Sequence, residues 1–271
     1  MIKLGETIIE QNHFPDNSLF LRVPWNSGNS NVITWYYEND AELFTLICLR
    51  KHYGRLPMVL DMPYCPHARM DRVKNYDEVF TLKYFCDVIN SLNFSEVYIT
   101  DPHSNVCAAL LNNVSVNHAD VSDAISNAVS EIVRTYEDGY IGDNLVFFYP
   151  DDGAGKRYNG NCGCRKLPFT TGSKKRDWRT GKIEKLVIND PEVVNGKDVL
   201  IVDDICSRGG TFYHSAKALK EAGAKNIYLY VTHCENTILE GELLTSGLIK
   251  KVYTTNSIFT KEHEMIEVFE L

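Results

Sequence analysis

Short runs of β-branched and aromatic residues alternate along this chain with longer amphipathic stretches. The runs that we expect to form strands are residues 57–61, 96–100, 145–149, 199–202, 227–231 and 250–253. The stretches that we expect to form helices are residues 39–53, 76–92, 104–112, 121–136 and 211–222. Strands that alternate with helices build βαβ units around a parallel sheet. The pattern therefore predicts an α/β fold, and such sheets bind ligands at the carboxyl ends of their strands.

Two of the expected strand ends resemble each other. One strand runs into the sequence DPHS and a helix, and another runs into Asp203, Asp204, a glycine-bearing loop and a helix. This weak internal similarity indicates two α/β halves with a boundary near residues 116–121. We therefore expect one domain at residues 1–118 and a second at residues 119–271.

A long segment, residues 151–186, contains few strand or helix signals and many Gly, Lys and Arg residues. A loop of that length in a compact protein is usually functional or mobile. Its second half is basic, although the chain as a whole has a formal net charge of −8. A basic segment on an acidic protein suggests a local anionic ligand, whereas the overall charge disfavours a general nucleic-acid binder.

Several features indicate a cytoplasmic protein without a membrane or nucleic-acid partner. The start, MIKLGETIIEQ, lacks the charged and apolar regions of a signal peptide, and no apolar run is long enough to span a bilayer. The eight cysteines show no spacing typical of a disulfide framework. Cys162 and Cys164 lack a second Cys or His pair at zinc-site spacing. We expect reduced cysteines, as is usual in the cytoplasm.

The segment KDVLIVDDICSRGGTFYHSAKALKEAG combines a buried strand, two carboxylates and a glycine turn before a helix. Asp203 and Asp204 follow the apolar run and are placed to hold sugar hydroxyls. Gly209 and Gly210 allow the backbone to approach an anion closely, and Thr211 adds a hydroxyl where the helix begins. The helix N-terminus offers unpaired N–H groups to a phosphate. The alternative is an ordinary strand–turn–helix connection, but paired aspartates before Gly-Gly-Thr favour a phosphate site.

This segment resembles the ribose-phosphate loop of the phosphoribosyltransferase fold. That fold includes the transferases and the ribose-phosphate diphosphokinases, also called phosphoribosyl diphosphate (PRPP) synthetases. The resemblance implies two phosphoribosyltransferase-like α/β domains with mainly parallel central sheets, the second of which carries this loop. It also implies a set of residues that bind ribose phosphate, namely Asp203, Asp204, Ser207, Arg208, Gly209, Gly210 and Thr211.

Two further segments are similar to the ATP-binding parts of the synthetases. The sequence PYCPHARMDR resembles a Pro-Tyr pair followed by Ala-Arg-x-Asp-Arg, which implies that Arg69, Asp71 and Arg72 face ATP. Without the resemblance, two arginines in a Pro-bounded loop suggest anion binding only moderately, and a solvated loop is the alternative. The sequence FPDN resembles a Phe-x-Asp-Gly motif that reaches the ATP of a neighbouring subunit, which implies roles for Phe14 and Asp16 and a homo-oligomer, a dimer or larger.

Metal and catalytic positions are implied in the same way. The sequence DPHS resembles the Asp-x-His-(Ala/Ser) motif that serves the Mg²⁺ on ATP, which implies that Asp101 and His103 bind metal and that His103 also binds ATP. Mg²⁺ needs only one or two protein ligands because it keeps several waters. The sequence PDDGAGKR resembles the family motif near the second metal and the ribose, and Asp151 matches its carboxylate. The sequence KKRDWRTGK resembles the mobile catalytic loop, with Lys174 and Arg176 at the reactive positions, although a charge run is by itself more often a solvated face.

The chain departs from the family pattern in its ribose loop. Ser207 replaces the third carboxylate of the loop, and Arg208 replaces a small hydroxyl residue. In the transferases the missing aspartate often acts as the base near the leaving nucleobase, so its absence argues against transferase chemistry. Arg208 adds a cation that could tighten binding of a 5-phosphate or serve a larger anion such as a diphosphate ester. In the ATP stretch, Met70 replaces a glutamine.

The resemblance implies Mg²⁺-dependent transfer of diphosphate from ATP to the C1 hydroxyl of ribose 5-phosphate, which gives PRPP and AMP. An alternative acceptor is ADP-ribose, since some phage relatives of the synthetase place diphosphate on it in a pathway that rebuilds NAD⁺. Two further alternatives are a phosphoribosyltransferase and a non-catalytic regulatory homologue. The transferase alternative leaves PYCPHARMDR without a role, and the regulatory relatives typically have disrupted catalytic loops, whereas Lys174 and Arg176 persist here.

Overall fold

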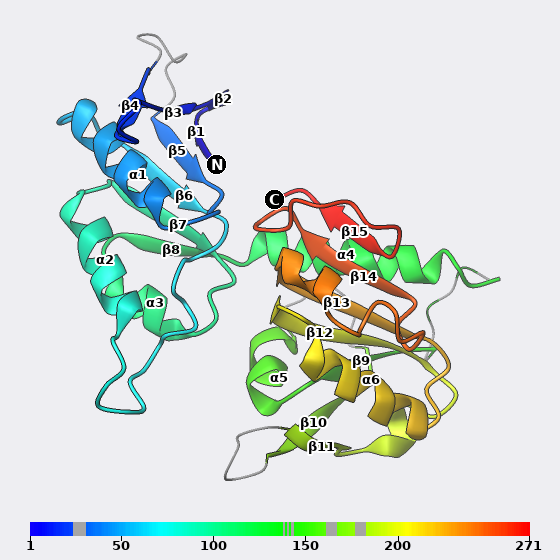
Figure 1. Cartoon of the computed structure of the whole chain (residues 1–271). Helices are drawn as coiled ribbons and strands as arrows, with labels where there is room; N and C mark the ends of the chain where they lie inside the picture. Colours follow the sequence, from blue (N-terminus) through cyan, green and yellow to red (C-terminus); the bar gives the residue numbers. More distant parts are fainter. Residues whose placement is uncertain (24–30, 138, 140, 142–143, 161–166, 177–182) are drawn as a thin grey trace. The chain divides into compact units, whose positions relative to one another are not determined.

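The computed structural model describes residues 1–23, 31–137, 139, 141, 144–160, 167–176 and 183–271, with only the backbone at residues 174–176 and 183–185 (Figure 1). The chain divides into two compact units, Met1–Asn117 and His118–Leu271. Each unit has its own sheet and its own hydrophobic core. Within the described ranges, no helix combines the length and the apolar character that are needed to cross a bilayer.

The first unit is built on a six-stranded sheet with the strand order β2-β1-β5-β6-β7-β8. Strands β5 to β8 are parallel, whereas β1 pairs antiparallel with both β2 and β5. The strands are β1 Ile2–Leu4, β2 Thr7–Ile8, β5 Val32–Trp35, β6 Val59–Met62, β7 Glu96–Thr100 and β8 Val114–Asn117. The helices are α1 Ala41–His52, α2 Thr81–Ser91 and α3 Asn105–Leu110, and β3 Gln11–His13 forms a separate hairpin with β4 Leu19–Leu21.

The second unit is built on a seven-stranded sheet with the strand order β11-β10-β9-β12-β13-β14-β15. Every neighbouring pair in it is parallel except β10 with β11. The strands are β9 Leu145–Tyr149, β10 Phe169–Arg176, β11 Ile183–Ile188, β12 Asp198–Cys206, β13 Ile227–Cys234, β14 Lys251–Thr255 and β15 Ile266–Phe269. The helices are α4 Ala119–Val133, α5 Asp152–Tyr158 and α6 Gly210–Glu221, with 3₁₀ turns at Pro191–Val193 and Asn236–Glu240.

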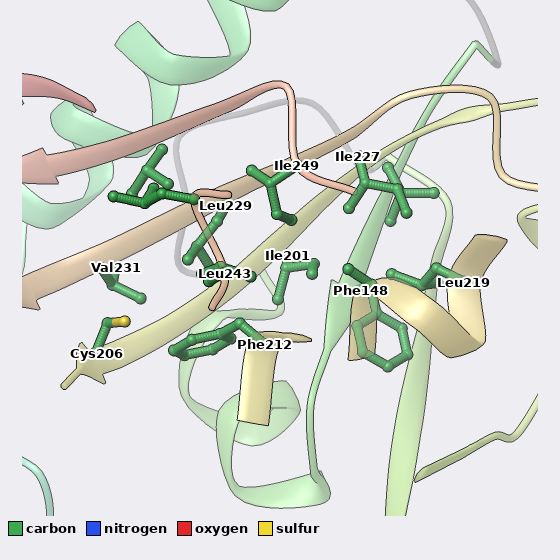
Figure 2. Packing of buried hydrophobic residues seen from close by; sticks show 14 of the residues in the cluster. Phe148, Ile201, Cys206, Phe212, Leu219, Ile227, Leu229, Val231, Leu243 and Ile249 are labelled. Carbon is green, nitrogen blue, oxygen red and sulfur yellow. The ribbon is translucent and has the colours of Figure 1, made fainter. Parts of the chain in front are cut away.

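Strand β12 lies in the middle of the second sheet, paired with β9 on one side and β13 on the other. Every residue of β9 and β13 is buried, as expected for parallel strands whose two faces are both covered. On one face, Phe212 and Leu219 of α6 pack with Ile201 of β12 and Leu229 of β13 (Figure 2). A second cluster includes residues of α4 and α5. Residues of β12 therefore belong to two cores, one shared with α6 and the other shared with α4 and α5.

The α/β class with mainly parallel sheets is confirmed, but the expected long loop at residues 151–186 is wrong. Helix α5 occupies its start, and β10 and β11 pair antiparallel at the edge of the sheet. The sequence pattern did not predict these elements because Gly is rare inside helices and strands and Lys is a weak strand former. Gly172, for example, is required inside β10 because a Cβ there would lie 2.8 Å from the ring of Phe148.

The expectation that all the cysteines are reduced is also wrong. Cys65, in the loop after β6, forms a disulfide with Cys107 of α3, and their Cα atoms lie 7.5 Å apart. The two residues are 42 positions apart in the chain, so no local spacing pattern reveals the pair. Cys48, Cys86, Cys206 and Cys234 are free, and Cys162 and Cys164 lie outside the described residues.

Candidate active site

The two aspartates of the ribose-phosphate segment lie inside β12, near its carboxyl end. The strand extends through Cys206, beyond the expected end at residue 202, because its ladder with β13 continues to the pair Cys206↔Cys234. Asp204 is 6% exposed, and Asp203 is half-buried. Oδ1 of Asp203 accepts a hydrogen bond from the backbone N–H of Asp204 at 3.0 Å. Both carboxylates thus lie within a strand whose ladder with β13 runs past them.

The glycine turn leads directly into the N-terminus of α6. Gly209 is the N-cap residue with a φ of 77°, a left-handed conformation that favours glycine. Its carbonyl accepts a hydrogen bond from the N–H of Tyr213 at 2.8 Å, and α6 begins at Gly210. Residues 207–211 therefore place the first N–H groups of a twelve-residue helix at the carboxyl end of β12. This arrangement binds phosphate groups in many α/β proteins.

A segment that the motifs did not identify forms one wall of this turn. A Cβ built on Gly241 would lie 1.9 Å from the carbonyl oxygen of Arg208, and a Cβ built on Gly209 would lie 2.9 Å from Leu243. Next to this contact, Nη2 of Arg208 lies 2.8 Å from Oε2 of Glu240. The side chains of that ion pair are 71% and 59% exposed, so the pair lies at the rim of the turn. No sequence signal points to Glu240 or Gly241, because they contact the turn only through tertiary packing.

Helix α5 contributes a third carboxylate and a cation. Asp151 is its N-cap residue, and Oδ1 of Asp151 accepts a hydrogen bond from the N–H of Ala154 at 3.1 Å. At the other end of the helix, Nη1 of Arg157 lies 3.5 Å from Oδ2 of Asp204. The motifs matched Asp151 to a site position but assigned no separate role to Arg157.

Negative charge is concentrated where these residues meet. Burial raises the pKa of Asp203 well above its ordinary value, and the neighbouring carboxylates Asp204 and Asp151 raise it further. Such a cluster favours a bound cation, and a hydrated Mg²⁺ needs only one or two carboxylates from the protein. Among the described side chains, no group of three or more His, Cys, Asp or Glu residues is arranged to hold a metal ion directly. Asp151, Asp203 and Asp204 are oxygen donors of the kind that Mg²⁺ prefers.

In the first unit, two loops follow neighbouring parallel strands. Strands β6 and β7 pair with Met62 opposite Ile99, and residues 63–72 and 101–104 follow them. Asp71 joins the loops. A hydrogen bond from Arg72 holds the pKa of Asp71 below its ordinary value, and a hydrogen bond from Ser104 and the charge of His103 lower it as well.

The remaining residues expected to bind ATP or metal in the first unit differ in exposure. Asp101 is 5% exposed and has a φ of 41°, a backbone conformation that is uncommon outside glycine. His103, Arg69 and Arg72 are exposed, and Nε of Arg72 lies 2.8 Å from Oδ1 of Asp71. Loop 63–72 thus presents its arginines to solvent while its carboxylate faces the second loop.

Phe14 and Asp16 lie in the turn between β3 and β4. The Phe14 side chain is 52% exposed. Oδ1 of Asp16 accepts hydrogen bonds from the hydroxyl of Ser18 at 2.6 Å and from its N–H at 3.0 Å, which hold the pKa of Asp16 below its ordinary value. The turn is therefore tied by its own residues and presents an aromatic side chain outward.

Lys174 and Arg176 belong to the end of β10, opposite Leu186 and Ile183 of β11. Residues 177–182, the rest of the expected catalytic loop, lie outside the described residues, as do the two side chains. Strands β10 and β11 are antiparallel neighbours, so Lys174 and Arg176 lie next to β11, the edge strand of the sheet.

Comparison with known proteins places the chain among synthetases of similar length. A family model described as a phosphoribosyl transferase domain matches residues 163–261. The ribose-phosphate pyrophosphokinase of Thermococcus kodakarensis is 30% identical over 270 residues, which cover 97% of this chain and 90% of that protein. The ribose-phosphate pyrophosphokinase of Pyrococcus abyssi is 29% identical over 258 residues, which cover 93% of this chain and 85% of that protein. The crystal structure of phosphoribosylpyrophosphate synthetase from Mycobacterium smegmatis shares the fold, with a TM-score of 0.72 at 16% identity over 97% of this chain and 86% of that chain.

Proposed function

This chain belongs to the ribose-phosphate pyrophosphokinase family, and we propose that it transfers diphosphate from Mg·ATP to the C1 hydroxyl of ribose 5-phosphate, giving PRPP and AMP. One observation carries the proposal. The paired carboxylates Asp203 and Asp204 lie on a buried central strand directly before the left-handed turn at Gly209 and the N-terminus of α6. A phosphorylated sugar needs carboxylates that accept hydrogen bonds from its hydroxyls, and N–H groups nearby that donate to its phosphate.

The second unit would bind the acceptor sugar. Asp203 and Asp204 accept hydrogen bonds from the ribose hydroxyls, and the N–H groups of residues 209–211 donate to the 5-phosphate. Ser207 and Thr211 add hydroxyl groups, and Arg208 adds a positive charge at the rim of the turn. Asp151 stands beside the carboxylate pair and would hold a hydrated cation near the ribose.

The first unit would bind the nucleotide. Arg69 and Arg72 are exposed, and Arg69 could form paired hydrogen bonds to phosphate or stack on the adenine. Asp101 and His103 would hold the Mg²⁺ that accompanies ATP, and Asp71 orients the loops that carry them. When bound, Mg²⁺ neutralises phosphate charge on ATP and so favours attack at phosphorus.

Phe14 and Asp16 would reach the ATP of a neighbouring copy, which requires a homo-oligomer, a dimer or larger. The outward-facing aromatic ring at the tip of the β3–β4 hairpin supports this role. A single chain would then contain an incomplete nucleotide site.

The chemical step requires alignment and charge neutralisation more than covalent help. The C1 oxygen of ribose attacks the β-phosphorus of ATP, the bond from that phosphorus to the bridging oxygen of AMP breaks in line, and the proton of the C1 hydroxyl passes to water. Lys174 and Arg176 would cover the transferred diphosphate and stabilise the charge that develops as the bond to AMP breaks. Closure over the diphosphate would also exclude water and limit hydrolysis of ATP.

A second acceptor, ADP-ribose, is favoured by one specific observation. Arg208 is paired with Glu240 at the exposed rim of the phosphate turn, so its guanidinium lies near the end of the proposed 5-phosphate site. A diphosphate ester would find a cation there. The products would be AMP and ADP-ribose carrying a 1-diphosphate.

A direct assay distinguishes these possibilities. The protein is incubated with Mg·ATP and either ribose 5-phosphate or ADP-ribose, and AMP and the 1-diphosphate ester are measured by ³¹P NMR and chromatography. AMP formed only with ribose 5-phosphate supports the first acceptor, and a higher kcat/KM with ADP-ribose supports the second. Absence of AMP with both acceptors would refute the diphosphotransferase, and consumption of PRPP with a free nucleobase would identify a transferase instead.

A further inference from the structure

Helix α5 presents two groups of opposite charge to the carboxylates of β12. Asp151 is its N-cap residue, and its last turn contains Arg157, whose Nη1 atom lies 3.5 Å from Oδ2 of Asp204. The Arg157 side chain is 28% exposed, and that of Asp204 is 9% exposed. The ion pair is therefore shielded from solvent on the aspartate side and reachable on the arginine side.

The orientation of Arg157 is supported by neighbouring groups. The guanidinium carbon of Arg157 lies 5.9 Å from the centre of the Tyr158 ring, within the range of a cation–π interaction. Tyr158 is 3% exposed and belongs to the core that also includes Val202 of β12. The helix is thus packed on the strand whose carboxylate Arg157 faces, so the guanidinium is held in place before any ligand binds.

A cation beside a shielded carboxylate fixes the orientation of that carboxylate. Arg157 supplies a positive charge within ion-pair distance of the Asp204 carboxylate. Removing one partner of a shielded ion pair leaves an uncompensated charge, which is costly. Without Arg157, the Asp204 carboxylate would also lose a charged partner that orients it.

We propose that Arg157 is a positioning residue that acts through Asp204 to hold the acceptor sugar. The inference rests on the proposed function, because it assigns to Asp204 the binding of ribose hydroxyls. A positioning role of Arg157 can be distinguished from a direct contact between Arg157 and the phosphate. A contact made by Arg157 itself persists when Asp204 is changed, whereas an effect transmitted by Asp204 disappears.

A double-mutant cycle tests this difference. The variants are Arg157→Gln, Asp204→Asn and the combination, with Arg157→Lys as the charge-conserving variant and Lys156→Gln as a matched control on the exposed side of the same helix. Binding of ribose 5-phosphate and of ATP is measured by calorimetry, apart from turnover. We expect Arg157→Gln to weaken ribose 5-phosphate binding about tenfold and to change ATP binding less than about twofold, with partial rescue in Arg157→Lys. The double variant should bind the sugar phosphate no more weakly than Asp204→Asn alone.

Three results would overturn the proposal: additive losses in the double variant, a loss of ATP binding as large as the loss of sugar binding, or no loss in Arg157→Gln. If the wild-type protein binds ribose 5-phosphate but releases no AMP, the proposed reaction fails and the cycle still decides the role of Arg157. If it binds no ribose 5-phosphate, a crystal structure of Arg157→Gln decides that role. A displaced Asp204 carboxylate supports positioning, and an unmoved one refutes it.

Discussion

Gly241 lies against Arg208 so closely that a Cβ on Gly241 would come 1.9 Å from the Arg208 carbonyl oxygen. The obstacle is backbone, so it cannot rotate away as the end of a side chain can. The turn that is proposed to bind phosphate is therefore shaped by a residue more than thirty positions further along the chain, at the end of the 3₁₀ turn Asn236–Glu240.

The substitution Gly241→Ala is expected to displace this turn. Overpacking of this kind typically costs about 1–3 kcal/mol in the free energy of unfolding. The KM for the acceptor sugar should rise as well, because the N–H groups of residues 209–211 move. Urea unfolding measures the first effect. Gly210→Ala is the control for stability, since no heavy atom lies within 4 Å of a Cβ built there. Equal stability of the two variants would contradict the proposed packing.

The ion pair between Arg208 and Glu240 is expected to affect binding more than folding. Exposed pairs contribute about 0–1 kcal/mol to stability, so Glu240→Gln should leave the melting temperature nearly unchanged. Removing the carboxylate frees Arg208 for the anionic acceptor and should lower the KM for ribose 5-phosphate several-fold at low salt. Glu242→Gln removes the same charge from an exposed neighbour. If both variants change the KM equally, overall charge rather than the pair is responsible.

Asp203 is expected to make the protein less stable as pH rises. Its raised pKa means that the folded state keeps a proton that the unfolded state has already released above about pH 3.9. The free energy of unfolding should therefore fall with increasing pH from that value through the folded-state pKa. Asp203→Asn should flatten this dependence and stabilise the protein at pH 8 by on the order of 1 kcal/mol. Urea titrations at pH 5 and pH 8 measure it, with exposed Asp152→Asn as the control. Parallel pH profiles for wild type and Asp203→Asn would refute the assignment.

The catalytic positions can be separated from the binding positions by kinetics. Arg176→Ala or Lys174→Ala is expected to lower kcat by on the order of 10³-fold, by analogy with arginines that stabilise transferring phosphoryl groups. Binding of ribose 5-phosphate should change little. Lys175→Ala, between the two positions, tests whether any loss of positive charge has the same effect. Near-normal turnover of Arg176→Ala would remove this loop from the mechanism.

Removal of divalent metal is expected to abolish turnover. Excess EDTA should stop AMP formation, and added Mg²⁺ should restore it, because the transferred phosphates carry negative charge that the protein's side chains only partly offset. The assay follows AMP release with and without metal at constant ionic strength. Full activity in excess EDTA would contradict the metal role of Asp101, His103 and Asp151.

Much of the sheet could be predicted because its strands are self-contained apolar runs. Residues 96–100 and 145–149 were expected to be strands and form β7 and β9 with the same bounds. Helix α2 is shorter than the expected 76–92 and begins at Thr81. Glu78 explains the difference, since its carboxylate accepts hydrogen bonds from the N–H groups of Lys74 and Asn75 and stabilises a turn there. Strands β10 and β11 were missed because Gly and Lys are poor strand signals, and the hairpin is stabilised by tertiary contacts: β10 pairs with β9, and Leu186 and Ile188 of β11 pack in the core with α6.

The sequence by itself determined the family, the α/β class and the order of the motifs, because each motif is a continuous run whose strand, glycine turn and helix start are local properties. Only the tertiary structure decided which residues surround the carboxylates. Arg157 faces Asp204, Glu240 pairs with Arg208, and Gly241 makes room for the phosphate turn, because packing of helices and loops onto the central sheet brings distant residues together. Such contacts depend on shape and distance in three dimensions, which no spacing along the chain encodes.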